Sequence, residues 1–330
     1  MPRFPKRISW WLAAAATVAC MAAGLWLGGS TMAAARFDQP ITIVVTFPPG
    51  GGTDLLARKL GAALQQRIGQ SVVVENRPGA SGNIGARHVA EAAGDGATLL
   101  MVNSSFAINP AVYRQLDFDP RQDFKAVFNV GTIASVLVVP QASALHSLAD
   151  ARAAAQVQDL PFASCGNGTP QHMAGEMLAQ AAQMHLQHVP YKGCGPAITA
   201  VAAGQVPLGV VTASSAAPLI EAGRVRAIAI TAPQRLAQWP LVPTVAEQGV
   251  AGFAVEQWHG LLAPAATGDA LVQRMHAVLA QILAEPAMQQ SLREQGYTPV
   301  QQSAAQFGQL IAADIDRYGA VAQQLGLRVD

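Results

Sequence analysis

Continuous apolar runs alternate with helical stretches from residue 41 onward, and this alternation most constrains the fold. The strand-like runs of the first half cover residues 41–47, 71–75, 98–102 and 135–139. These runs are continuous rather than alternating, as expected for parallel strands covered on both faces. Helical patterns follow at 54–68, with Leu56, Leu60 and Leu64 on one face, and at 82–93. This order predicts an α/β fold with a doubly wound, mostly parallel sheet.

The same rhythm restarts after Pro140. Further strands are predicted at 161–164, 187–190, 208–212 and 225–231, and further helices at 171–183, 196–203 and 216–222. A strand at 253–262 and helices at 271–284, 287–295 and 304–325 complete the chain, and we expect these helices to return to the first unit.

The chain would then cross between two units twice, near Pro140 and near Gly252, which places a cleft at a hinge. The predicted lobes are residues 36–139 with 253–330, and residues 140–252. Two domains also fit the length, because about 295 mature residues would make a large single domain.

The first 35 residues have the layout of a secretory signal. Arg3, Lys6 and Arg7 precede an apolar run from about residue 8 to 27, and small residues lead to a cleavage site at Ala35. The alternative is a retained membrane anchor, because the run approaches a span of about 20 residues.

The charge balance argues against nucleic acid as a partner. Lys and Arg number 21 against 20 Asp and Glu, and removing residues 1–35 leaves 18 against 20. A nearly neutral chain lacks the basic footprint that nucleic acid requires, so a small ligand is the expected partner. Cys165 and Cys194 remain after processing; they are either one disulfide, worth roughly 3 kcal/mol, or two buried thiols.

A glycine-rich turn, FPPGGGTD at 47–54, joins a predicted buried strand to a helix. Ligands of open α/β sheets bind at such strand ends. Glycines let the backbone approach a ligand closely, and the free N–H groups of a first helical turn attract an anion. The alternative is an ordinary turn in which Thr53 or Asp54 caps the helix.

A parallel turn, SCGNGTP at 164–170, repeats this pattern in the second unit. Two such turns in separate lobes can face one another across a cleft. Ser104 and Ser105 follow one strand, and Thr212, Ser214 and Ser215 follow another. Their hydroxyl groups are candidates to complete the pocket.

The chain offers little for catalysis. The nearest arrangement to a catalytic pair is Cys165 with His172 or His188 as base. However, Cys194 competes for Cys165, and no third group orients the base. His185 and His188 lack a cysteine or carboxylate cluster, so no metal site, cofactor or catalytic residue is predicted.

Six ordered blocks resemble the Bug family of periplasmic receptors, the extracytoplasmic component of tripartite tricarboxylate transporters. They are PGGGTD at 49–54, ENRPGASGNIGA at 75–86, DGATLL at 95–100, GNGTPQH at 166–172, PYKGCGPA at 190–197 and PTVAEQG at 243–249. The resemblance extends over nearly all of the mature chain.

The resemblance implies a two-lobed, Venus-flytrap binding protein in the periplasm, a monomer without enzymatic activity. It would hold a small carboxylate and deliver it to the membrane subunits of the transporter. Di- and tricarboxylates, acidic amino acids and aromatic carboxylates all fit. A receptor for signalling would have the same fold, and a hydrolase using Cys165 is the remaining alternative. By family likeness, the ligand-binding residues are Phe47, Gly51, Gly52, Thr53, Asp54, Ser104, Gly168, Thr169, Gln171, Thr212, Ala213 and Ser214.

Overall fold

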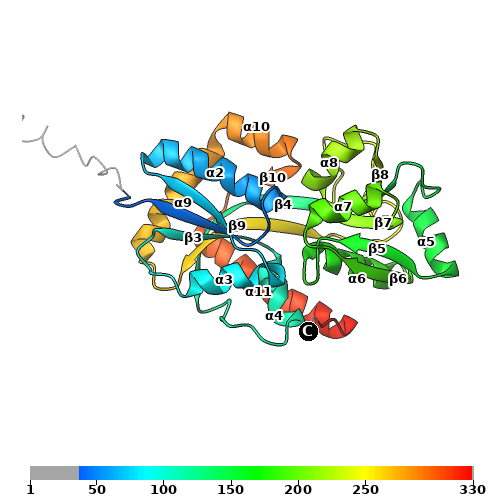
Figure 1. The fold of residues 1–330 in the computed structure, drawn as a ribbon, viewed down its shortest axis with the longest axis horizontal. Coiled ribbons are helices and arrows are strands. Elements are labelled where there is room, and N and C mark those ends of the chain that lie inside the picture. The colour runs from blue at the N-terminus through cyan, green and yellow to red at the C-terminus, as the bar shows by residue number, and fades with distance from the viewer. Residues whose placement is uncertain (1–36, 329–330) are drawn as a thin grey trace, which may run out of the picture. The chain divides into compact units, whose positions relative to one another are not determined.

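A 17-residue strand, β4 (Phe124–Pro140), belongs to two sheets and joins the two halves of the protein. The computed structural model describes residues 37–328, so the predicted signal segment and the cleavage site at Ala35 lie outside the described residues. Figure 1 shows the blue, orange and red elements gathered on one side and the green ones on the other, with β4 and yellow β9 between them.

The other strands of residues 37–328 are short. They are β1 (Ile41–Val45), β2 (Val72–Asn76), β3 (Thr98–Asn103), β5 (Leu160–Ser164), β6 (Leu186–Pro190), β7 (Leu208–Thr212), β8 (Val225–Ile230), β9 (Glu256–Pro264) and β10 (Tyr297–Pro299). The helices are α2 (Gly52–Ile68), the 3₁₀ turn η1 (Ala80–Gly82), α3 (Asn83–Ala90), α4 (Ser105–Val112), α5 (Leu148–Val157), α6 (Pro170–Ala181), α7 (Cys194–Ala202), α8 (Ala213–Glu221), α9 (Asp269–Ala284), α10 (Pro286–Glu294) and α11 (Ala304–Leu325).

The strand order is β2-β1-β3-β9-β4-β7-β5-β6, with β8 and β10 also paired to β4. Parallel pairing joins β2-β1-β3 in one half and β6-β5-β7 in the other. The strands that pair with β4, namely β7, β8, β9 and β10, all run antiparallel to it. The α/β fold with two lobes is thus confirmed.

Strand pairing indicates where the chain changes lobes. β4 pairs with β9 up to Ala134 and with β7 from Ser135 onward. On the way back, the Val255 N–H still donates to Thr231 O, and β9 begins at Glu256. We therefore propose crossings at 134–135 and 255–256, near the positions expected from the sequence.

Each lobe has its own core. Phe162, Leu178 and Val210 belong to a buried cluster in the second lobe. Trp258 and Phe307 belong to another in the first, where α11 packs against α4 and β4. No helix in residues 37–328 is long and apolar enough to cross a membrane.

Two helices and most of β4 were not predicted. No element was predicted for the segment that forms α4. Phe106, Ala107 and Ile108 are buried in the first core, so packing stabilises this short helix. α5 begins after Ser147, whose side chain accepts from the Asp150 N–H. A serine N-cap of this kind marks a helix start in a sequence, but the prediction did not include it.

Candidate ligand-binding cleft

The turns singled out in the sequence border a small cavity between the lobes, which we call the inner chamber, of about 50 Å³. The first lobe contributes Phe47, Gly51, Gly52, Thr53, Asn103, Gln257, His259 and Tyr297, and the second contributes Cys165, Thr169, Gln171, Gly193, Cys194, Thr212 and Ser214. None of these lining residues is Asp, Glu, Lys or Arg. The chamber therefore offers hydrogen bonds without a formal charge.

Helix α2 presents an uncapped N-terminus to the inner chamber. Its N-cap, Gly51, has no side chain to accept from the first-turn N–H groups. A Cβ atom at Gly52 would lie 3.0 Å from Ser214 Oγ, so glycine allows the backbone of one lobe to approach the other. The first-turn donors are left for a ligand or water.

Asp54 stabilises this turn from beneath. Its carboxylate accepts from the Gly50 N–H at 2.9 Å, from Arg58 Nε at 3.1 Å and from Asn76 Nδ2 at 2.9 Å. Burial alone would raise the pKa of Asp54, but these hydrogen bonds outweigh it and lower that pKa. The charge of Asp54 is therefore stabilised by partners within the first lobe.

Helix α7 presents a second uncapped N-terminus, from the opposite lobe. Its N-cap is Gly193, which has no side chain to accept from the first turn. A disulfide between Cys165 and Cys194 ties this turn to the loop after β5, so the first of the two alternatives left open by the sequence is the one observed. Both cysteines line the inner chamber.

Helices α6 and α8 also begin at the chamber, but each has a side-chain cap. Thr169 Oγ1 accepts from the His172 N–H, and Thr212 Oγ1 accepts from the Ser215 N–H. Pro170 at the start of α6 favours the helical backbone there. Four helix N-termini therefore meet at one uncharged chamber.

The structure brings together most of the residues predicted to bind a ligand. Those that line the inner chamber are Phe47, Gly51, Gly52, Thr53, Thr169, Gln171, Thr212 and Ser214. Asp54, Ser104, Gly168 and Ala213 do not line it. Ser104 Oγ instead accepts from the Trp258 N–H at 2.9 Å, and Gly168 packs beside Asn109 and Tyr113.

Sequence reasoning missed four polar residues of the chamber: Asn103, Gln257, His259 and Tyr297. Gln257 and His259 carried a signal, because they are polar residues on either side of Trp258, at alternate positions of a strand that continues as an apolar run. Asn103 ends β3, at the kind of strand end where we sought ligands. No pattern in the sequence pointed to Tyr297.

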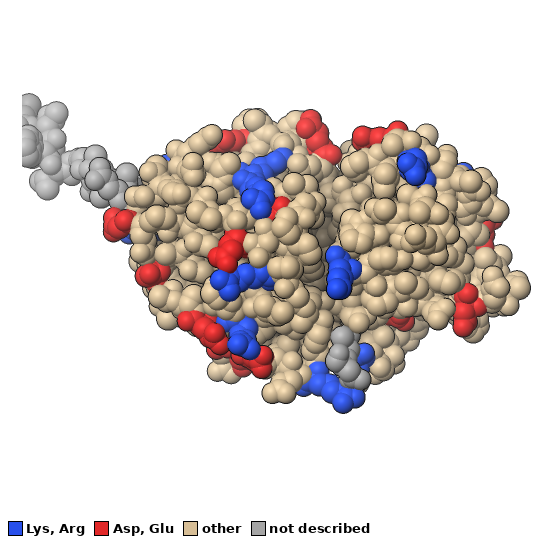
Figure 2. All heavy atoms as spheres, viewed as in Figure 1, with Lys and Arg blue, Asp and Glu red and all other residues tan. Residues whose placement is uncertain are grey.

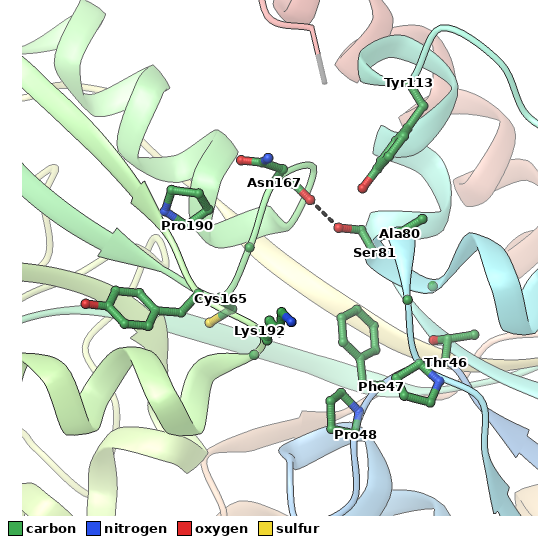
Figure 3. A pocket seen from close by; sticks show the side chains of 16 residues that line it. Thr46, Phe47, Pro48, Ala80, Ser81, Tyr113, Cys165, Asn167, Pro190 and Lys192 are labelled. Atoms are coloured by element: carbon green, nitrogen blue, oxygen red, sulfur yellow. Dashed lines mark hydrogen bonds between the residues drawn. The ribbon is translucent and has the colours of Figure 1, made fainter. Parts of the chain in front are cut away.

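A larger cavity, the outer chamber, opens beside the inner one and measures about 500 Å³. The two share Phe47, Cys165 and Gly193. Among its lining residues Lys192 alone is charged. Figure 3 shows Lys192 between Cys165 and Phe47, with Tyr113 at the far side.

Hydrogen bonds join the lobes on both sides of the cleft. Ser81 Oγ donates to Asn167 O, the dashed line in Figure 3. Deeper in, Gln171 Nε2 donates to Gln257 Oε1 at 2.9 Å and to Ser135 Oγ at 3.0 Å. Gln171 therefore connects α6 to both crossing strands.

A histidine cluster lies behind the second-lobe turn. His172, Glu176 and His188 have ligand atoms within 4.8 Å of one another, a grouping of metal-binding type that we did not predict. However, the Gly168 N–H donates to His172 Nδ1 at 3.3 Å, so the proton of that ring lies on Nε2, toward Glu176. His188 Nε2 lies 2.6 Å from Ser164 Oγ. These contacts stabilise the turn, and we assign no metal to them.

Two histidines, His259 in the core and His188 partly buried, predict a pH-dependent stability. Burial lowers the pKa of His259 to about 3, and burial, with the neighbouring His172, lowers that of His188 to about 3. In the unfolded chain both titrate near 6.5. As pH falls below 6.5 the unfolded chain therefore binds protons that the folded chain does not. We expect the free energy of unfolding to be lower at pH 5 than at pH 7 by roughly 1–2 kcal/mol per histidine.

Urea denaturation at the two pH values measures this difference. His188→Gln should reduce it, whereas His185→Gln, at an exposed position, should leave it as in the wild type. An unfolding free energy that is the same at pH 7 and pH 5 would contradict the neutral state of these two rings in the folded protein.

Comparisons with known proteins identify the family. The family model described as "Tripartite tricarboxylate transporter family receptor" matches residues 56–327. The protein BugT of Bordetella pertussis is 32% identical over 295 residues, covering 88% of this chain and 90% of the relative.

Two solved structures from Rhodopseudomonas palustris are similar throughout. Rpa4515 with adipate has a TM-score of 0.85 and 32% identity, covering 88% of this chain and 99% of that one. MatC with bound malate has a TM-score of 0.78 and 29% identity, covering 86% and 99%. The chain therefore belongs to the tripartite tricarboxylate transporter receptors, a family of periplasmic solute-binding proteins that includes the Bug proteins, as its sequence blocks indicated.

Proposed function

We propose that this protein captures a small carboxylate between its lobes and delivers it to the membrane subunits of a tripartite tricarboxylate transporter. The observation that carries the proposal is the pair of uncapped N-termini of α2 and α7, which come from opposite lobes and border one uncharged chamber. Backbone N–H groups at helix N-termini bind anions. Relatives of the same fold have adipate or malate bound.

The size of the two chambers suits a ligand with an anionic end and a larger body. The inner chamber has room for little more than one carboxylate group. The body would extend into the outer chamber, past Phe47 toward Lys192 and Tyr113. Figure 2 shows a furrow between the two halves of this face, with mainly uncharged residues along it.

The proposed contacts follow from the lining of the inner chamber. The N–H groups of Gly52 and Thr53 would bind one side of the carboxylate, and those of Cys194 and Gly195 the other, with the Thr212 and Ser214 hydroxyls nearby. Because donors come from both lobes, the anion would favour the closed state, and its loss would favour opening. That reversibility is what delivery to a transporter requires.

We propose that the chain is exported through its N-terminal segment, cleaved near Ala35, and acts as a periplasmic monomer. It would bind without chemical turnover. The cysteine-hydrolase alternative needs a free thiolate, and Cys165 is in a disulfide.

A thermal-shift screen of residues 36–330 tests the proposed ligand class. The panel would hold adipate, malate, citrate, aspartate and benzoate, with alanine and glucose as uncharged or zwitterionic comparators. A ligand at 100 times its Kd stabilises the folded state by about 2.7 kcal/mol, which raises Tm by several degrees. We expect shifts from one carboxylate class only. Shifts from glucose or alanine alone, or none in a folded protein, would contradict the proposal.

Gly52→Ala tests where the anion binds. The added methyl group would lie 3.0 Å from Ser214 Oγ and 3.6 Å from the Tyr297 hydroxyl, inside the inner chamber. We expect at least about a tenfold weaker Kd for the carboxylate found in the screen, since one tenfold step is 1.4 kcal/mol.

The matched control is Gly319→Ala. Gly319 lies in helix α11, away from both chambers, and an added Cβ there meets no atom within 4 Å. Isothermal titration calorimetry should give Gly319→Ala the wild-type affinity. Equal affinity in both variants would place the ligand outside the inner chamber.

A further inference from the structure

The Tyr297 hydroxyl is a buried donor without a partner at the floor of the inner chamber. The residue is 3% exposed, and the hydroxyl makes no hydrogen bond with the described part of the chain. A buried hydroxyl without a partner is costly and calls for an explanation. Since Tyr297 lines the chamber, a ligand there could supply the partner.

The backbone around Tyr297 fixes where this hydroxyl lies. Tyr297 starts β10 and pairs with Ile133 of the crossing strand β4. Gly296 before it has φ +80°, a left-handed conformation that favours glycine. A Cβ atom there would lie 3.2 Å from Ala213 Cβ in the second lobe. Tyr297 is therefore held at the junction of the two lobes.

The hydroxyl is also close to the proposed anion donors. It lies 3.6 Å from the position that a Cβ atom of Gly52 would occupy. The Tyr297 ring packs edge-on against His259, whose Nε2 is 3.2 Å from Thr53 Oγ1. The first turn of α2 and the Tyr297 hydroxyl thus border the same space.

We propose that the Tyr297 hydroxyl donates a hydrogen bond to the buried carboxylate of the ligand and so helps the chamber to prefer a carboxylate over an amide. This inference rests on the proposed function. A carboxylate has two oxygens that accept hydrogen bonds, whereas a primary amide has one accepting oxygen and one NH2 group that donates. The donors of Tyr297, Gly52 and Thr53 can satisfy both oxygens of a carboxylate, but with an amide some of them would face the NH2 group.

The ionisation of the neighbouring groups fits this role. Burial raises the pKa of Tyr297, so the hydroxyl keeps its proton at neutral pH. Burial lowers the pKa of His259 to about 3, so that ring stays neutral beside the chamber. No acidic side chain among the lining residues competes for the hydroxyl.

Tyr297→Phe isolates the hydroxyl, because the ring and its packing remain. We expect the Kd for the carboxylate selected by the screen, with adipate and malate as first probes, to rise about 10- to 100-fold, the loss typical of a hydrogen bond to a charged group. The preference for adipate over adipamide should shrink in parallel. The Tm of the ligand-free protein should stay the same or rise, since an unpartnered buried hydroxyl has been removed.

Tyr318→Phe is the matched control. Tyr318 in α11 is also a buried tyrosine, but it belongs to the core of the first lobe and does not line the chamber. It should keep the wild-type Kd. If Tyr297→Phe also binds as the wild type does, within about twofold, the inference fails while the receptor function stands. If the folded wild type binds no member of the panel, both fail.

Discussion

The attraction between an anion and the exposed N–H groups of helix first turns is the interaction on which the proposed site depends. α2 and α7 begin at glycines whose missing side chains leave these donors unpaired. Each such terminus contributes roughly 0.3–1 kcal/mol at an exposed site and more where water is excluded. The path of β4 and β9 between the lobes makes it possible for two termini to act on one group.

The charged residue of the α2 turn, Asp54, serves the scaffold. Asp54 is bound by Arg58, Asn76 and the Gly50 N–H, so its charge holds the α2 turn in shape. The Cys165–Cys194 disulfide does the same for the α7 turn without adding a charge. A chamber built in this way can hold an anion by oriented dipoles and release it when the lobes separate, whereas a buried ion pair would be costly to form.

Most of the fold could be predicted from the sequence, because its inner strands are buried on both faces and its helices have a clear period. The two glycine-rich turns could also be identified, since each stands between a strand and a helix. The extent of β4 could not, because residues 124–134 pair with a strand more than 120 positions away. α4 was missed because burial, and not local propensity, stabilises it.

The lining of the site was less predictable than its turns. Asp54 and Ser104 have the right residue types at the right positions, but their side chains bond to the scaffold. Tyr297 reaches the chamber through a short strand whose partner is distant in sequence, so no local pattern announces it. Which polar residues face a cleft is decided by tertiary packing.

The most direct test of the account follows the backbone amides themselves. Nitrogen–proton correlation spectra of the mature protein, recorded with and without the carboxylate of highest affinity, report on each N–H group separately. If the uncapped N-termini of α2 and α7 bind the carboxylate, the largest changes in amide chemical shift occur at Gly52, Thr53, Cys194 and Gly195. Changes confined to Lys192 and the outer chamber, with these four amides unaffected, would contradict it.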